Sequence, residues 1–242
     1  MKKSVFFFSA LCSGTLLLSS CNSDKTADST ATTTETTSTD AASGDMAGMD
    51  ESKMAGMDES KMAGDSPQMK AMNDNMAKMA AMKMKGNVDH DFAHMIIEHH
   101  KGAIAMSDIE LRDGKDAHMK EMAAKTKADQ EKEIAELEPI AERLDSAPNN
   151  YQPLDPADPF TSKMKASMDN MMQNMPTMSA NSDMNYNMLM TVHHQGALEL
   201  AQAQVDHGKD TKLKEMAQKM IAAQKKEIAD LKDWHDKNAD KM

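Results

Sequence analysis

The chain has 242 residues and a formal net charge of −11, with 39 acidic side chains against 28 basic ones. An acidic chain without a basic stripe argues against nucleic-acid binding and against docking on anionic lipid by charge. Aromatic residues make up only 3% of the chain, whereas 28 residues are methionine. Methionine normally fills gaps in a core sparingly, so packing alone does not explain this number.

The N-terminus predicts export and a lipid anchor. Lys2 and Lys3 precede an apolar stretch, residues 5–18, that is too short to span a bilayer. It ends in L-S-S-C at residues 18–21, which resembles the lipobox of bacterial lipoproteins. The resemblance implies a signal peptide at residues 1–20 and acylation of Cys21, which would tether the chain to the cell envelope, on the periplasmic side or at the outer membrane. An ordinary signal peptide without lipid is the alternative.

This processing would leave no thiol in the mature chain, because Cys12 is removed and Cys21 carries lipid. Residues 21–66 then predict a disordered tether, since their Thr, Ser and Ala tract offers nothing for a core. The sequence M-A-G-M-D-E-S-K occurs at residues 46–53 and again at 54–61. This repeat is either a flexible, multi-site cation chelator or a neutral low-complexity linker.

Residues 67–242 are the predicted folded domain, and they contain an internal duplication. Residues 89–137 align with residues 183–231 without a gap. The repeat units extend over about residues 67–145 and 160–242, and their matched pairs include His99/His193, His100/His194, Gly102/Gly196, Gly114/Gly208, Asp116/Asp210, Glu133/Glu227 and Leu137/Leu231.

Each unit predicts a helix, a glycine turn and a second helix. In the first unit we expect helices over about residues 89–111 and 116–138, with Gly114 as a C-cap and Asp116 as an N-cap. A proline-rich connector, residues 148–159, separates the units. Two such hairpins bury their apolar stripes most economically as an all-α four-helix bundle with pseudo-twofold symmetry, ferritin-like in general shape. Short Met-rich amphipathic helices are expected before each hairpin, with spaced methionines Met69, Met72, Met76, Met79 and Met164, Met168, Met171, Met175.

The candidate metal ligands are histidines and methionines on the hairpin helices. His99 and His193 share the inward faces of their helices, and His100 and His194 lie at the flanks, where a neighbouring helix can meet them. Burying four imidazoles requires partners for their ring nitrogens, which metal coordination would supply. Thioethers one and two turns away would complete a soft ligand set suited to Cu(I) or Ag(I), from Met95 and Met106.

A second candidate set occupies the opposite face of the first helix. His90 and His94 are one helical turn apart, and the second unit has Met184 and Met188 at the same positions. His and Met share little except their affinity for copper, so the exchange indicates copper ligands; independent drift of two solvated faces is the alternative. The second helices add Met119, Met122, His118 and Met216 as further candidates.

A di-iron centre is the obvious competing site for a four-helix bundle, but it requires Glu-x-x-His pairs that the chain lacks. The segments H-H-K-G-A-I-A-M at residues 99–106 and H-H-Q-G-A-L-E-L at residues 193–200 resemble the H-H-x-G-A-x-x-M core of the CopM-like family, long catalogued as domain of unknown function number 305. The resemblance implies a helical, envelope-located protein that binds copper through His and Met and supports copper resistance. Leu189 and Leu200 replace the second unit's methionines, which weakens its site.

The expected function is therefore non-enzymatic sequestration of Cu(I), with Cu(II) and Ag(I) as further ligands, outside the cytoplasm. Metal ions and the membrane are the expected partners, together with a copper chaperone or efflux protein, and nucleic acid is not. Two alternatives stay open: an oxidoreductase that converts Cu(I) to Cu(II), and a metal-free envelope module that uses Met-rich helices as interaction faces.

Overall fold

Helices account for nearly all of the chain that the computed structural model describes, residues 44–45 and 66–241. The all-helical bundle predicted from the sequence is confirmed. The elements in chain order are β1 (Gly44–Asp45), α3 (Pro67–Ala80), β2 (Lys83–Met84), α4 (Val88–Asp113), α5 (Ala117–Leu144), α6 (Pro159–Gln173), α7 (Ser182–His207), α8 (Thr211–Asn238) and the 3-10 turn η2 (Ala239–Lys241). Strands β1 and β2 pair antiparallel, with Gly44 opposite Met84.

Capping residues set the helix starts. Asp116 accepts hydrogen bonds from the backbone N–H groups of His118 and Met119 at the start of α5, and Asp210 accepts from Leu213 N–H at the start of α8. Gly114 is the C-cap of α4, as predicted, but its φ of −64° is not left-handed. Glycine is required there because a Cβ would lie 2.1 Å from a carboxylate oxygen of Glu110.

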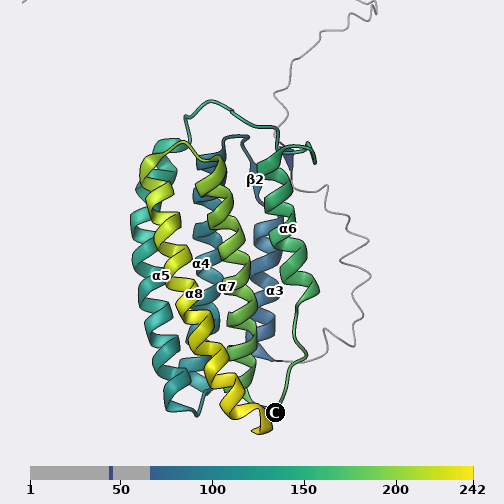
Figure 1. Cartoon of the computed structure of the whole chain (residues 1–242), viewed down its shortest axis with the longest axis vertical. Helices are drawn as coiled ribbons and strands as arrows, with labels where there is room; N and C mark the ends of the chain where they lie inside the picture. Colours follow the sequence, from purple (N-terminus) through teal and green to yellow (C-terminus); the bar gives the residue numbers. More distant parts are fainter. Residues whose placement is uncertain (1–43, 46–65, 242) are drawn as a thin grey trace, which may run out of the picture. The chain divides into compact units, whose positions relative to one another are not determined.

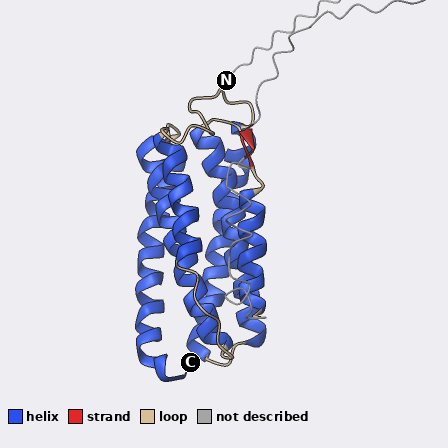
Figure 2. Cartoon of the chain, turned by 90° about the vertical axis from the view of Figure 1, so that its right-hand side faces the viewer, coloured by secondary structure: helices blue, strands red, loops and turns tan. Residues whose placement is uncertain are grey.

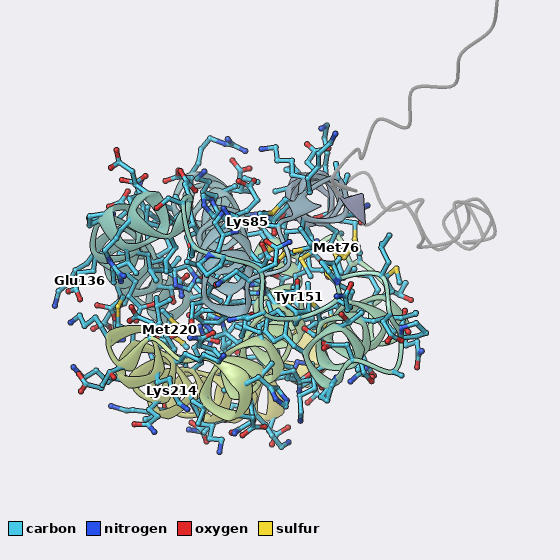
Figure 3. The ribbon with its side chains drawn as sticks, turned by 90° about the horizontal axis from the view of Figure 1, so that it is seen from above. Met76, Lys85, Glu136, Tyr151, Lys214 and Met220 are labelled. Atoms are coloured by element: carbon cyan, nitrogen blue, oxygen red, sulfur yellow. The ribbon has the colours of Figure 1, made fainter. Side chains whose placement is uncertain are left out.

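The helices form two rows of three, α5–α4–α3 and α8–α7–α6, which meet where α4 packs on α7 (Figure 1; Figure 3). Helices α5 and α3 flank α4 in one row, and α8 and α6 flank α7 in the other. All of these elements belong to one compact unit, residues 41–242. The two central helices therefore lie deepest, and their facing side chains have the least access to water.

Two aspartates fix the central helices in antiparallel orientation. Asp89, at the start of α4, accepts hydrogen bonds of 2.9 and 3.0 Å from the backbone N–H groups of Lys209 and Asp210, which follow the end of α7. Asp183, at the start of α7, accepts two of 2.8 Å from the turn after α4. Each half thus satisfies the exposed amides of the other half's turn, which is a pseudo-twofold relation.

Helices α3 and α6 cover the central helices with methionine. The predicted methionines Met69, Met72, Met76 and Met79 are buried along α3, and Met164, Met168 and Met171 are buried along α6. The expected fourth member on α6, Met175, lies beyond the helix, which ends at Gln173, and is only partly buried. Most of the buried thioethers therefore have a packing role in the bundle.

The structure extends the expected second helices. Helix α5 continues through Pro139 to Leu144, six residues beyond the expected end at 138, with Leu137, Ala141 and Leu144 buried. Burial of this last stretch outweighs the hydrogen bond that the proline removes. The loop after α5 and the short strand β2 lie at one end of the bundle, at the top in Figures 1 and 2.

The predicted leader, the acylated Cys21 and most of the predicted tether lie outside the described residues. Within residues 44–45 and 66–241, none of the helices combines the length and apolar character needed to cross a membrane.

Candidate metal centre

Two imidazoles meet at the centre of the α4–α7 contact. The rings of His99 and His193 have centroids 3.7 Å apart and an interplanar angle of 40°. Both side chains are fully buried. The inward orientation predicted from the helical spacing places each of them on the face that also carries Ala103 or Ala197, whose small side chains allow the helices to approach closely.

The outer histidines each reach a glutamate on the flanking helix of their own half. Nε2 of His100 lies 2.8 Å from a carboxylate oxygen of Glu133 on α5, and Nε2 of His194 lies 3.0 Å from one of Glu227 on α8. Both imidazoles are fully buried, while Glu133 is 27% exposed. The sequence predicted that a neighbouring helix meets His100 and His194, and the two glutamates are the side chains through which α5 and α8 do so.

Glu227 is held in its charged form. Burial opposes ionisation, but the contact with His194 and a 2.8 Å ion pair with Lys125 outweigh it and lower the pKa of Glu227 to about 2. Lys125 comes from α5 in the other half, so the ion pair also joins the outer helices. Sequence reasoning did not single out either glutamate, although the match of Glu133 with Glu227 between the repeats was the available signal.

The eight ring nitrogens of His99, His100, His193 and His194 have no hydrogen bond of normal geometry among the described residues. The two short contacts to glutamate have suitable distances, but their direction is poor for a hydrogen bond. Burial, reinforced by the neighbouring imidazoles, lowers the pKa of His99 and of His193 well below the ordinary value. The central pair is therefore neutral near pH 7 and has free lone pairs, which is the state that binds a metal ion.

The glycine of each H-H-x-G-A segment allows a covering helix to approach closely. A Cβ at Gly102 would lie 2.3 Å from the side-chain oxygen of Asn75 on α3, and one at Gly196 would lie 2.3 Å from the sulfur of Met171 on α6. A larger side chain at Gly102 would displace Asn75 as far as its Cβ, whereas one at Gly196 would displace the flexible end of Met171. The covers differ, since the first half places an amide there and the second half a thioether.

The structure buries most of the methionine candidates. Met122 and Met188 are only partly buried. Met119 accepts a 3.9 Å hydrogen bond at sulfur from the amide of Asn187 on α7, so this thioether already has a polar partner. The fully or nearly fully buried candidates are Met95, Met106, Met119, Met184 and Met216.

The second candidate set occupies two separate places in the bundle. His90 and His94 lie side by side, with ring centroids 4.4 Å apart. Met184 and Met188 occupy the equivalent turn of α7, which lies at the other end of the bundle because α4 and α7 are antiparallel. The histidine pair instead meets Asp145, the residue that follows α5. The sequence contained no signal for this carboxylate.

The family profile described as "Domain of unknown function (DUF305)" matches residues 17–141 and again residues 89–235. The chain belongs to the DUF305 family. The resemblance to the CopM-like family that the two H-H-x-G-A segments indicated is thereby confirmed. Both matched stretches of the DUF305 chain include His99 and His100, and the second also includes His193 and His194. A comparison with curated proteins found no match.

Solved structures similar to this DUF305 protein include CopM in the apo form and CopM in the Cu(I)-bound form. Each is 23% identical, with a TM-score of 0.47, and the match covers 62% of this chain and 96% of CopM. A DUF305 fragment from Deinococcus radiodurans is 18% identical, with a TM-score of 0.44, and covers 60% of this chain and 93% of the fragment. Further CopM structures are Cu(II)-bound and silver-bound.

Proposed function

We propose that the protein binds Cu(I) through the buried cluster of His99, His100, His193 and His194. One observation supports this most directly: none of the eight ring nitrogens has a hydrogen bond of normal geometry among the described residues. A buried polar atom without a partner costs about 1–3 kcal/mol, so a purely structural cluster would be expensive. A metal ion shared between imidazoles would remove part of that cost.

The ligand chemistry favours a soft monovalent cation over zinc or iron. The facing imidazoles of His99 and His193 are neutral, and α4, which carries His99, also buries the thioethers of Met95 and Met106. Neutral nitrogen and sulfur donors suit Cu(I) and Ag(I), whereas carboxylate-rich sites suit harder ions. The two glutamates lie within 3.0 Å of the outer imidazoles only, so the facing pair at the centre has no carboxylate neighbour of this kind.

The biological role that we infer is sequestration of copper outside the cytoplasm by a non-enzymatic, lipid-anchored protein. Acylation of Cys21 would hold the domain at the envelope, and the methionine repeat would capture metal weakly before it reaches the bundle. Transfer to or from a chaperone or efflux protein would require access to the buried cluster. Glu133, partly exposed and in contact with His100, marks the side where the cluster is nearest to solvent.

Native mass spectrometry of the whole chain titrated with Cu(I) under anaerobic conditions tests the proposal. We expect tightly held copper that is lost when His99, His100, His193 and His194 are all replaced by Leu. His118, also a candidate from the sequence, is exposed and is not part of the buried cluster, so His118→Ala is the matched control and should leave copper uptake unchanged. Unchanged uptake after the fourfold replacement would contradict the proposal, as would the absence of tight binding by the wild-type protein.

If circular dichroism shows that the fourfold variant is unfolded, the double variant with His99→Leu and His193→Leu takes its place, because it replaces only the two facing rings.

Two further measurements separate the alternative functions. Oxygen uptake after addition of Cu(I) distinguishes a sink from a cuprous oxidase, because a sink consumes oxygen at most stoichiometrically. A metal-free interaction module would retain no copper in equilibrium dialysis.

A further inference from the structure

A second cluster of metal-ligating side chains lies at the end of the bundle where α4 begins and α5 ends. It consists of His90 and His94 on α4 and Asp145, the C-cap residue of α5. One ligand atom from each residue lies within 4.8 Å of the others. Unlike the central cluster it is open to solvent, since the side chains of His90, His94 and Asp145 are 13%, 37% and 60% exposed.

We propose that His90, His94 and Asp145 form a binding site for a divalent cation of the zinc class, separate from the buried four-histidine cluster. The site has two imidazole nitrogens and one carboxylate oxygen, which is a ligand set suited to Zn²⁺ or Cu²⁺ rather than to Cu(I). Two histidines one helical turn apart are a recurrent zinc-binding arrangement on helices. An open fourth position would be filled by water.

The distances correspond to a shared cation. Oδ1 of Asp145 lies 3.2 Å from Nε2 of His90 and 3.1 Å from Nε2 of His94. Ligand atoms around a tetrahedral zinc ion with bonds of about 2.0–2.1 Å lie about 3.3 Å apart. Two of the three distances between ligand atoms therefore already have nearly the required length, and the third, between the two imidazole nitrogens, is no more than 4.8 Å.

A carboxylate behind His90 determines which ring nitrogen faces the site. Nδ1 of His90 lies 2.7 Å from Oδ1 of Asp91, and an ionised carboxylate can only accept, so the hydrogen is on Nδ1. When His90 is neutral, Nε2 then presents its lone pair towards the oxygen of Asp145. Two lone pairs at 3.2 Å repel each other unless a proton or a metal cation lies between them.

The supporting carboxylate is itself held in place. Asp91 accepts hydrogen bonds from the backbone N–H groups of Lys85 and Gly86, at 2.9 and 2.8 Å, and from the hydroxyl of Tyr151 at 2.7 Å. Lys85 and Tyr151 are labelled in Figure 3, which looks onto this end of the bundle. A carboxylate that orients a ligating histidine is the usual outer partner of a protein metal site.

The charges around the site also favour a cation. The ammonium of Lys85 donates to the backbone carbonyl of Asp145 and leaves the carboxylate of Asp145 available. Asp145 follows the last turn of α5, where the helix dipole is negative, and a carboxylate there is stabilised by positive charge. A divalent ion bound by this carboxylate would add to the charge that Lys85 already places beside Asp145.

The second half of the molecule lacks the site and provides an internal control. Its equivalent positions are Met184, Met188 and Ala239, which is the C-cap residue of α8. Asn185 replaces the supporting Asp91 and accepts a 2.8 Å hydrogen bond from the backbone of Ser179. The two ligating nitrogens, the carboxylate and the supporting charge are therefore absent together, as expected if they serve one function in the first half.

Zinc titration of the whole chain against a chromophoric chelator tests the proposal. We expect one Zn²⁺ that is held tightly by the wild-type protein and at least tenfold more weakly by Asp145→Ala or His94→Met, each of which installs the second half's residue. His118→Ala, at an exposed histidine outside the cluster, is the matched control and should keep the tight Zn²⁺. Asp91→Asn leaves all three ligands in place, and we expect it to lower the affinity for this Zn²⁺ by about 10–100-fold because it removes the carboxylate that orients His90.

The proposal is overturned if the wild-type chain holds no Zn²⁺ tightly, if both ligand variants keep the wild-type affinity, or if His118→Ala loses the ion equally. Each variant is also titrated with Cu(I), and the site variants should keep the copper uptake of the wild type. Because zinc and copper binding are measured on the same proteins, the proposed zinc site can fail its test without the proposed copper cluster failing, and the reverse. Thermal unfolding of Asp145→Ala and His94→Met without metal should stay within about 2 °C of the wild type, because both positions are solvent-exposed.

Discussion

The two halves of the bundle agree at the centre and differ at the ends. His99 and His193 face each other, and each outer imidazole contacts the glutamate at the matching position of its own half. At the ends, the first half has histidines and carboxylates where the second half has methionine, asparagine and alanine. The comparison indicates that duplication preserved the centre, where the halves must fit each other, and left the ends free to acquire separate properties.

The turn-capping aspartates show how a shared framework tolerates different chemistry. Asp89 accepts a 2.6 Å hydrogen bond from the side-chain amide of Gln204. At the equivalent place in the other half, Asp183 faces Glu110, a carboxyl group that lies fully buried. Burial and the proximity of Asp183 raise the pKa of Glu110 to about 8. Glu110 is therefore protonated at neutral pH and donates a hydrogen bond to Asp183 as the amide of Gln204 does to Asp89.

The largest expected effect comes from removing either capping aspartate. Asp89→Ala leaves two backbone N–H groups and the amide of Gln204 without their acceptor, and we expect a loss of about 3 kcal/mol. Asp183→Ala should cost about the same at pH 6 but less at pH 9, where the wild-type protein already has two repelling carboxylates. Chemical denaturation at both pH values measures this. An equal cost for Asp183→Ala at the two pH values would contradict the assigned state of Glu110.

The central histidines should make the metal-free protein sensitive to acid. Their pKa is lowered in the folded state, so the unfolded chain binds more protons once the pH falls below about 6.5. Stability contributed by the neutral pair is therefore present at pH 7 and is lost progressively as the pH falls. Replacing His99 and His193 together by Leu should flatten the dependence of the melting temperature between pH 7 and 5. His118→Ala, at an exposed position, should leave the dependence as it is in the wild type.

Glu110 should have the opposite pH dependence. Its raised pKa means that the folded state binds the extra proton, so the stability it contributes is present in acid and is lost as the pH rises from about 4.5 through about 8. Glu110→Gln copies Gln204 and should raise the melting temperature at pH 9 by about 2–4 °C, with little effect at pH 6. Melting curves of both proteins at the two pH values test this. A stabilisation of the same size at pH 6 would show that Glu110 is charged in the folded protein.

The sequence was sufficient for the elements that depend on local chemistry. Asp116 and Asp210 cap helices where predicted, and the 3.6-residue spacing placed His99 and His193 on the inward face. It was less reliable for the end of α5, where burial of Leu144 continues the helix beyond Pro139.

The contacts between helices could not be predicted from spacing. Asp145 meets His90 and His94 only because α5 returns along α4 and ends beside its first turn. The exchange of His90 and His94 for Met184 and Met188 indicated copper ligands at both places, and spacing along the chain did not show that the antiparallel central helices place the two pairs at opposite ends of the bundle. Identity of the matched glutamates was visible in the repeat alignment, but their approach to the imidazoles depends on how closely the flanking helices pack.

The smallest expected effect tests whether a polar contact in one half replaces an apolar one in the other. The hydroxyl of Tyr186 lies 3.2 Å from that of Ser107, whereas the equivalent positions in the other half are Phe92 and Ala201. Tyr186→Phe should cost about 1 kcal/mol, because it leaves the buried hydroxyl of Ser107 without this partner. The double variant with Ser107→Ala should recover part of that loss, since it reproduces the apolar pair. A double-mutant cycle by urea denaturation measures the coupling, and strictly additive losses would mean that the two hydroxyls do not interact.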